Sequence, residues 1–239
     1  MTNPTIVLIH GAFTDASSWR PLYDDLTRDG LMVKAPANPL RGIGFDADYT
    51  QSVIAQIEGP VLLVGHSYGG AVITAVGNAG NVVGLVYVAG YAPDEGESLQ
   101  ELGSNFPASL AGPYLRPSVL RDGSTEFTLD PSGFRDVFAA DLPADDAAFM
   151  AIAQRPLAAV AFTEPAPAPA WRSKPSWAVL PTADCAIHPE VHRFSYDRMG
   201  ATVTEVEGAS HAVMLSRSDV VARVVRAGVR SPVGASSGT

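Results

Sequence analysis

The sequence predicts an α/β fold with a mostly parallel sheet of about six strands, flanked by helices, and a helical lid inserted after the fourth strand. Two observations support this prediction. Short apolar runs alternate with segments of helical period, which is the pattern of βα units on a parallel sheet. The alternation stops near residue 93 and resumes near residue 177, so a separate segment interrupts it. A chain of 239 residues is long enough for one such domain with an insertion.

The apolar runs predict strands that are buried on both faces, as parallel strands usually are. Four runs have this character: Thr5–Ile9, Leu31–Ala35, Val61–Val64 and Val82–Ala89. Two further strands are predicted at Trp177–Leu180 and Thr202–Val206. Helical periodicity follows most of them, for example at Trp19, Leu22 and Leu26. The last helix is predicted around Val220 to Val225, with a capping box from Ser216 to Asp219.

The interruption between the fourth and fifth strands predicts a lid. Residues 93–170 hold ten of the 19 prolines and only short amphipathic pieces. The pairs Asp130-Pro131 and Leu142-Pro143 are typical of helix starts. We therefore divide the chain into a core of residues 1–92 and 171–230, a helical lid of residues 93–170, and a small, polar, flexible tail of residues 231–239.

The charge balance narrows the classes of partner. With 25 acidic and 16 basic residues the formal net charge is −9, which disfavours nucleic acid and anionic membrane surfaces. No apolar run reaches the roughly 18–20 residues of a membrane helix. The single cysteine, Cys185, excludes an intrachain disulfide, and no secretory signal pattern precedes the first strand. We expect a cytoplasmic protein, and the sequence leaves a homodimer open.

The strongest chemical signal is Gly65-His66-Ser67-Tyr68-Gly69-Gly70, directly after a predicted strand and directly before a predicted helix. A tight strand-to-helix turn exposes a serine hydroxyl, and its strained backbone requires small neighbours two residues away on either side. The helix N-terminus favours negative charge that develops beside the serine. A glycine-rich turn with an incidental serine is the alternative. The flanking elements favour Ser67 as a nucleophile.

A serine nucleophile needs a base, and the base needs a group that orients it. His211 follows the last predicted strand, and Asp184 follows the strand before it, so both lie at the carboxyl edge of the sheet. This order, serine then acid then histidine, matches the strand–turn–helix serine motif. We predict a triad of Ser67, Asp184 and His211. Asp94 is the alternative acid, although its position favours a role in bracing the lid hinge.

The loop after the first strand, His10-Gly11-Ala12-Phe13, predicts an oxyanion hole. The backbone N–H groups of Ala12 and Tyr68 would form it, and Gly11 would permit a close backbone approach. We expect His10 to brace this loop through hydrogen bonds rather than to act as the base.

The lid is predicted to cover the crevice at Ser67 with mostly apolar contacts. Nearness in sequence to the catalytic loops suggests Phe13, Tyr68, Tyr91 and Met214 for the substrate pocket. Trp171 is a further candidate because it lies where the chain returns from the lid. For Trp171, packing in the core is the alternative.

His188 and His192 are spaced four residues apart and could in principle bind a metal. No third ligand is evident, and His188 precedes Pro189 at a predicted helix start. We therefore expect a solvated helix end, and neither a metal nor a cofactor is predicted.

Four segments resemble the branch of the α/β-hydrolase superfamily that contains plant methylesterases, hydroxynitrile lyases and small bacterial carboxylesterases. The segments are His10-Gly11-Ala12-Phe13, Gly65-His66-Ser67-Tyr68-Gly69-Gly70, Val88-Ala89-Gly90-Tyr91-Ala92-Pro93-Asp94 and Ser210-His211-Ala212-Val213-Met214. The resemblance extends from about residue 4 to residue 228 and is loose in the lid. It implies hydrolysis of carboxylic esters without a cofactor. The lyases place a lysine after the catalytic histidine and a threonine after the first histidine, where this chain has Ala212 and Gly11, which argues against lyase activity.

These observations predict a serine carboxylesterase that cleaves small to medium esters through an acyl-enzyme. The same triad could instead cleave lactones, amides or carbon–carbon bonds, or carry out perhydrolysis. A ligand receptor on the same fold is a further alternative. A pure receptor, however, has no need of a nucleophile, a base, an acid and an oxyanion loop together.

Overall fold

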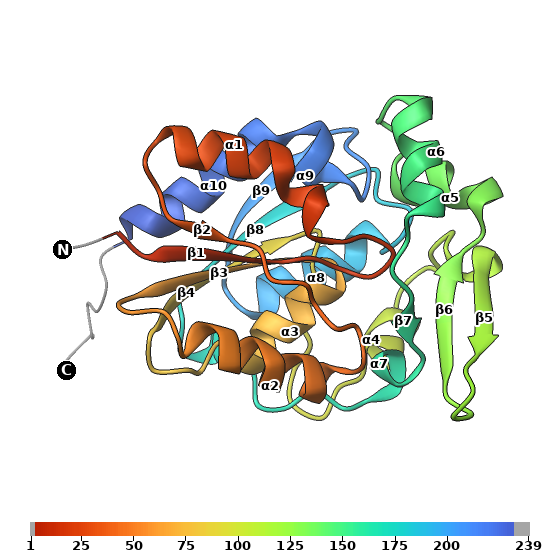
Figure 1. Cartoon of the computed structure of the whole chain (residues 1–239), viewed down its shortest axis with the longest axis horizontal. Coiled ribbons are helices and arrows are strands. Elements are labelled where there is room, and N and C mark those ends of the chain that lie inside the picture. Colours follow the sequence, from red (N-terminus) through yellow and green to blue (C-terminus); the bar gives the residue numbers. More distant parts are fainter. Residues whose placement is uncertain (1–2, 232–239) are drawn as a thin grey trace.

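The computed structural model describes residues 3–231, and its centre is a sheet of six parallel strands in the order β2-β1-β3-β4-β8-β9 (Figure 1). The strands are β1 (Thr5–Ile9), β2 (Val33–Lys34), β3 (Val61–His66), β4 (Val82–Val88), β8 (Ser176–Pro181) and β9 (Thr202–Val206). All six predicted strands are present. The predicted burial on both faces is wrong for β2, an edge strand whose Val33 is half-buried and whose Lys34 is exposed. Every residue of β3, the central strand that leads to Ser67, is buried. The predicted tail lies almost entirely outside the described residues.

Helices cover both faces of this sheet, as Figure 1 shows. The helices of the core are α1 (Arg20–Arg28), α2 (Ile43–Ile54), α3 (Tyr68–Val76), α8 (Pro189–Arg198), α9 (Val213–Ser216) and α10 (Ser218–Arg230). Side chains of α2, α3 and α8 form one apolar cluster with the sheet, and side chains of α1, α9 and α10 form a second cluster on the other face. The predicted capping box is wrong, because Ser216 ends α9 and α10 begins after Arg217 without a side-chain cap.

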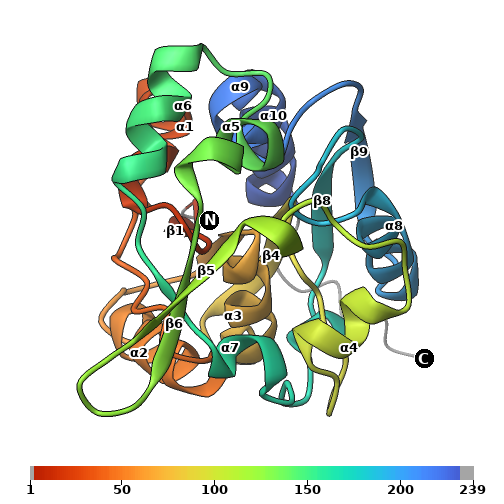
Figure 2. The ribbon, with the colours of Figure 1, turned by 90° about the vertical axis from the view of Figure 1, so that its right-hand side faces the viewer.

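The segment between β4 and β8 lies at the carboxyl edge of the sheet (Figures 1 and 2). Its helices and strands are α4 (Leu99–Ser104), η2 (Gly112–Tyr114), β5 (Leu115–Val119), β6 (Thr125–Leu129), α5 (Pro131–Phe138), α6 (Ala144–Ile152), β7 (Leu157–Ala158), α7 (Val160–Thr163) and η3 (Ala170–Arg172). We keep the name lid for residues 93–170. The lid is not only helical, because β5, β6 and β7 form a three-stranded antiparallel sheet.

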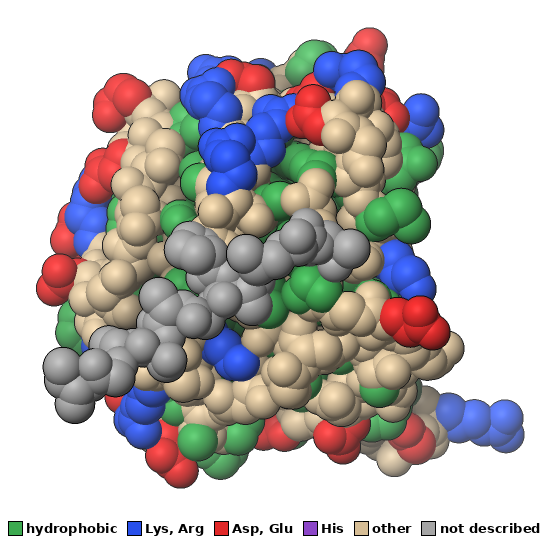
Figure 3. Space-filling view, turned by 90° about the vertical axis from the view of Figure 1, so that its left-hand side faces the viewer, with side chains coloured by type: hydrophobic (Ala, Val, Ile, Leu, Met, Phe, Trp, Pro, Cys, Tyr) green, Lys and Arg blue, Asp and Glu red, His purple; other side chains and the backbone are tan. Residues whose placement is uncertain are grey.

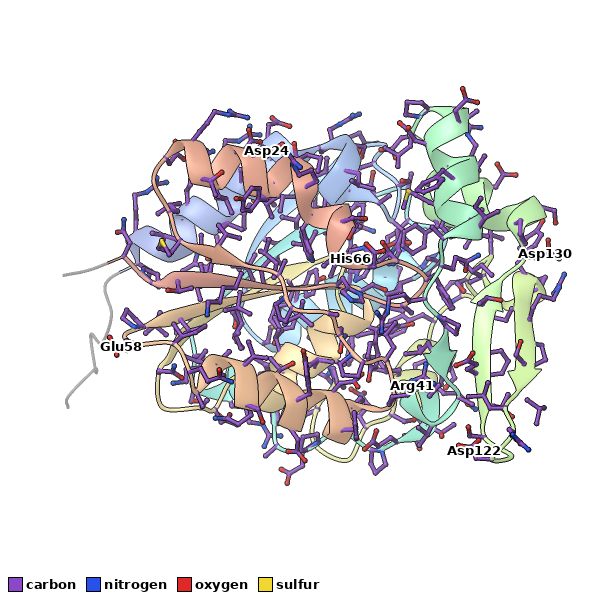
Figure 4. All side chains as sticks on the ribbon, in the orientation of Figure 1. Asp24, Arg41, Glu58, His66, Asp122 and Asp130 are labelled. Atoms are coloured by element: carbon purple, nitrogen blue, oxygen red, sulfur yellow. The ribbon has the colours of Figure 1, made fainter. Side chains whose placement is uncertain are left out.

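A tight turn explains this second sheet. Gly123 has a φ of +85°, and the Leu120 amide donates to the Ser124 carbonyl at 2.8 Å. An Asp-Gly pair is a common hairpin signal because the glycine adopts positive φ at little cost. Asp122 marks this turn at the tip of the hairpin in Figure 4.

The lid is fixed to the core at several points. The Glu164 carboxylate accepts hydrogen bonds from the amides of Ile43 and Gly44 at 2.6 and 3.2 Å, at the N-terminus of α2. Arg41, which Figure 4 shows at the border between core and lid, donates to Glu126 and to the Pro156 carbonyl. These contacts hold the lid over the end of the sheet that carries the loops after β1, β3, β8 and β9.

The opposite end of the molecule carries scattered acidic and basic side chains with small apolar areas between them (Figure 3). Within residues 3–231, no helix is both long enough and apolar enough to cross a membrane.

Candidate active site

Ser67 stands in the turn between β3 and α3 with a strained backbone. Its φ is +52° and its ψ is −123°, which is unfavourable for a residue with a side chain. The neighbouring glycines make this turn possible. A Cβ on Gly65 would lie 2.4 Å from the Gly69 carbonyl oxygen, and a Cβ on Gly69 would lie 2.3 Å from the Ile9 carbonyl oxygen. The turn holds Ser67 at the end of the sheet, where its side chain is 7% exposed.

The loop after β1 approaches Ser67 closely. A Cβ on Gly11 would lie 2.6 Å from the Ser67 Cβ, so no larger residue fits there without displacement. Phe13 has a φ of +62°, and its amide donates to the Arg155 carbonyl of the lid at 3.1 Å. The amides of Ala12 and Tyr68 have no acceptor among residues 3–231. Both residues line the same cavity as Ser67, so the two unpaired donors belong to the surroundings of the serine.

Asp184 and His211 are hydrogen-bonded to each other in the interior. Asp184 Oδ2 lies 2.7 Å from His211 Nδ1, and both side chains are almost fully buried. The carboxylate accepts this bond, so Nδ1 carries the hydrogen and Nε2 is left as the proton acceptor. Burial opposes ionisation of Asp184. The charge attraction of His211 and the hydrogen bonds from both neighbouring histidines outweigh it and place the pKa of Asp184 well below its usual value.

His192 is a polar residue of the site that the sequence analysis missed. Its Nε2 lies 3.0 Å from Asp184 Oδ2, the oxygen that also binds His211. The expected solvated helix end is therefore wrong for His192, which is 1% exposed. His188 does cap the N-terminus of α8 by accepting from the Glu190 amide, so the two histidines do not converge. Within the described part of the chain, no group of three or more His, Cys, Asp or Glu side chains is arranged as a metal site.

Ser67 and His211 face the same cavity of about 140 Å³. In the part of the chain that the structure covers, no hydrogen bond joins the Ser67 hydroxyl to His211. In unliganded enzymes such bonds are often long or poorly aligned and shorten when substrate binds. The structure thus brings the three predicted triad residues to one place, with the acid–base pair formed and the serine beside it.

Two other histidines support the site without facing the cavity. His10 Nδ1 donates to the Gly11 carbonyl at 2.9 Å, and its Nε2 accepts from the Asn38 amide at 2.9 Å, so both ring nitrogens brace the loop as expected. His66, at the centre of Figure 4, donates from Nε2 to the His211 carbonyl at 3.0 Å. Complete burial, followed by the nearby His211 charge, lowers the pKa of His66 well below its usual value. His66 is therefore neutral near pH 7.

The cavity wall agrees with some of the predicted pocket residues. Core residues Ala12, Phe13, Tyr68 and Tyr91 line it together with the lid residues Leu99, Ser109, Ala111, Gly112, Leu115, Leu129, Phe138, Leu157 and Phe162, and with Ala186 and Ile187. Met214 and Trp171 are not among the lining residues, and their predicted placement is wrong. Met214 packs in the cluster with α1 and α10. Trp171 packs in the other cluster and donates from its ring nitrogen to the Pro93 carbonyl.

A larger outer cavity of about 680 Å³ adjoins the first. The two share seven lining residues, namely Tyr91, Leu99, Ser109, Leu115, Phe162, Ala186 and Ile187. Neither cavity has an Asp, Glu, Lys or Arg side chain in its lining. The space in front of Ser67 therefore continues outward between α4 and the lid sheet as an uncharged and mainly apolar passage.

Asp94, the alternative acid, lies at the lid hinge. Its Oδ1 is 2.5 Å from a guanidinium nitrogen of Arg172, which joins the first residues of the lid to the segment that follows it. It has no contact with His211 among the hydrogen bonds of the described chain. The geometry therefore places Asp184, and not Asp94, beside the histidine.

Comparisons with known proteins agree with this architecture. The model of the alpha/beta hydrolase family matches residues 6–224. A carbendazim hydrolyzing esterase from Nocardioides sp. (strain SG-4G) is 34% identical over 112 residues, which cover 40% of this chain and 46% of that protein. The chain therefore matches less than half the length of this curated relative.

Several solved structures share the fold. A pyrethroid hydrolase from Sphingobium faniae JZ-2 has a TM-score of 0.77 at 22% identity, covering 97% of this chain and 99% of its own. Polyneuridine aldehyde esterase has a TM-score of 0.80 at 20% identity, covering 95% and 99%. Tomato methylketone synthase I, complexed with 2-tridecanone, has a TM-score of 0.78 at 18% identity, covering 95% and 98%. The family model spans nearly the whole described core and lid, and the chain belongs to the alpha/beta hydrolase family.

Proposed function

We propose that the protein is a serine esterase that hydrolyses neutral, mainly apolar carboxylic esters through an acyl-enzyme on Ser67. The observation that carries this proposal is the buried Asp184–His211 pair, whose histidine faces the cavity that contains Ser67. A buried carboxylate on Nδ1 leaves Nε2 free to take a proton, which is what a serine hydroxyl needs to become a nucleophile.

The chemical steps follow from this arrangement. Ser67 Oγ attacks the ester carbonyl carbon while its proton passes to His211 Nε2. The carbonyl oxygen gains negative charge, and the unpaired amides of Ala12 and Tyr68 are the donors that stabilise it. The alcohol then leaves with the proton from His211. Water attacks the acyl-enzyme with His211 again as the base, which releases the acid and restores Ser67.

The lining of the two cavities supports the substrate class. Without charged side chains, neither cavity compensates the desolvation of a charged substrate group. The inner cavity of about 140 Å³ suits a small group beside Ser67, and the outer cavity of about 680 Å³ suits a bulkier alkyl or aryl group. Two similar proteins are named esterases, the carbendazim hydrolyzing esterase and polyneuridine aldehyde esterase, which is consistent with this proposal.

The test is hydrolysis of p-nitrophenyl acetate and butyrate by the purified protein, together with fluorophosphonate labelling and mass mapping of the labelled residue. We expect labelling at Ser67 alone, and Ser67→Ala should lower kcat by about 10⁴- to 10⁶-fold. Ser52→Ala is the matched control, because Ser52 is an exposed serine of α2 that lines neither cavity and should keep normal turnover. Ester binding without turnover would favour a receptor and refute the esterase. Labelling at another residue would refute Ser67 as the nucleophile.

A further inference from the structure

We propose that His192 is a positioning residue that shares the Asp184 carboxylate with His211 and thereby limits how strongly Asp184 stabilises the His211 imidazolium. This inference rests on the proposed function, because it concerns the acid and base of the same site. His192 does not touch the cavity in front of Ser67, so it acts only through Asp184.

The Asp184 carboxylate accepts four hydrogen bonds. Oδ1 accepts from the amides of Ala186 and Ile187 at 2.8 and 2.9 Å. Oδ2 accepts from His211 Nδ1 at 2.7 Å and from His192 Nε2 at 3.0 Å. The two amides already fix the carboxylate in the turn after β8. The bond from His192 is therefore not needed to hold Asp184 in place, and its effect is on the oxygen that faces His211.

His192 is itself held rigidly. Its ring stacks on Tyr196 of the same helix, with ring centroids 5.5 Å apart. The Tyr196 hydroxyl donates to the Gly90 carbonyl at 2.9 Å and accepts from the Gly90 amide at 2.8 Å. The adjacent Tyr91 amide donates to the Ser67 carbonyl. Helix α8 is thus tied both to the acid and to the loop that supports the nucleophile.

The Asp184 carboxylate, as the shared acceptor, determines which nitrogens of His192 and His211 carry hydrogen. Because Nε2 of His192 faces a carboxylate oxygen, Nε2 carries a hydrogen and donates it. Each donor takes up part of the negative charge of the carboxylate, so an oxygen that serves two imidazoles attracts each less than it would attract one alone. His192 Nδ1 has no hydrogen-bond partner within residues 3–231. When the ring is neutral and its hydrogen is on Nε2, Nδ1 carries no hydrogen, so no buried N–H group is left without an acceptor.

A substitution at His192 does not itself alter the other ionisable groups around Asp184 and His211. The His66 ring lies 4.7 Å from the His211 ring, and Asp141 contacts Ser210 beside it. Tyr91, Tyr196 and Cys185 are near Asp184. Burial is the largest cause of the raised pKa of each, and the negative charge of Asp184 contributes further. None of these groups donates to Asp184 Oδ2. A change in the response of His211 to pH can therefore be assigned to the missing His192 donor.

The experiment compares His192→Phe, which keeps a ring but has no donor, with His192→Gln, whose side-chain amide can still donate. The pH dependence of kcat/KM for p-nitrophenyl butyrate is measured from pH 5 to 9. In His192→Phe we expect the midpoint of the acid limb to move to higher pH by about half to one unit, because the full carboxylate charge then favours the imidazolium. His192→Gln should return the midpoint to its wild-type position. If thermal melting shows that His192→Phe is unfolded, His192→Leu takes its place.

NMR titration of the His211 ring in the same variants provides a readout that needs no turnover. A midpoint that moves with His192→Phe supports the inference even if the wild-type protein hydrolyses no ester, in which case only the proposed function fails. An unmoved midpoint in a folded His192→Phe, with or without a lower kcat, means that His192 only fills space, and it overturns the inference.

Discussion

Replacing Asp184 by asparagine tests the site most directly, because every hydrogen bond of this carboxylate has a known donor. The amides of Ala186 and Ile187 both require an acceptor at Oδ1, so the single oxygen of the asparagine side chain stays there. The asparagine nitrogen then takes the place of Oδ2 and faces two histidine nitrogens that carried hydrogen. His211 must move its hydrogen from Nδ1 to Nε2 to avoid two facing donors. Nε2 then no longer accepts the Ser67 proton.

The expected loss in kcat is about 10³- to 10⁴-fold, the size of the loss in serine hydrolases whose histidine is held in the wrong tautomer. This corresponds to about 4 to 5.5 kcal/mol of transition-state stabilisation. Turnover of p-nitrophenyl butyrate measures the loss, and circular dichroism melting checks that the fold is intact. Asp94→Asn is the control, because it removes the charge that pairs with the partly exposed Arg172 guanidinium and should cost less than about tenfold. If Asp94 were essential and Asp184 dispensable, the assignment of the acid would be wrong.

Three further predictions concern a glycine that packs on the nucleophile, a buried histidine and the outer cavity. Gly11→Ala places a Cβ 2.6 Å from the Ser67 Cβ, so the serine must shift and kcat should fall at least about 100-fold. Gly80→Ala is the control. A Cβ on Gly80 meets no atom within 4 Å, so this variant should leave turnover unchanged. The pKa of His66 is lowered in the folded state. Just below pH 6.5, therefore, the His66 side chain takes up a proton only in the unfolded chain. The free energy of unfolding should then fall by up to about 1.4 kcal/mol for each pH unit of acidification. Urea unfolding between pH 5 and 7 should show a shallower pH dependence in His66→Gln, and an unchanged slope would contradict the neutral, buried state. Gly103 lies in the wall of the outer cavity, and a Cβ added there meets no atom within 4 Å. Gly103→Phe should therefore partly fill this cavity and raise KM for p-nitrophenyl octanoate but not for p-nitrophenyl acetate. Equal effects on both esters would refute a separate outer subsite.

The parts of the site that sequence could predict are those fixed by local chain geometry. Ser67 is specified by the strand–turn–helix and its glycines, whose missing side chains the structure shows to be necessary. Asp184 and His211 follow from their positions after the last two strands, because parallel strands bring such loops to one edge of a sheet. The strands β1, β3, β4 and β8 were predictable because most of their residues are apolar, whereas the edge strands β2 and β9 contain polar and exposed residues.

What sequence could not provide is the direction in which side chains point after the elements pack. Met214 is close to His211 in the chain, but it packs in the cluster with α1 and α10 and does not line the cavity. The role of His192 depends on how α8 docks against the turn after β8, and spacing along a helix contains no information about that contact. The lid hairpin was detectable from Asp122-Gly123, but the prolines around it favoured a lid made only of helices.

The way the lid is attached has a consequence for how such enzymes diverge. Many attachments join a group in the lid to the backbone of the core: Glu164 to the amides at the start of α2, the Arg155 carbonyl to the Phe13 amide, and the Ala158 amide to the Leu40 carbonyl. A backbone partner is present whatever residue occupies its position. Substitutions in the core therefore leave these attachment points available, and cavity-lining lid residues such as Leu115 and Phe162 can be exchanged without undocking the lid. Substrate preference can thus evolve independently of the catalytic machinery, and a transplanted lid segment needs to retain only a few anchoring groups.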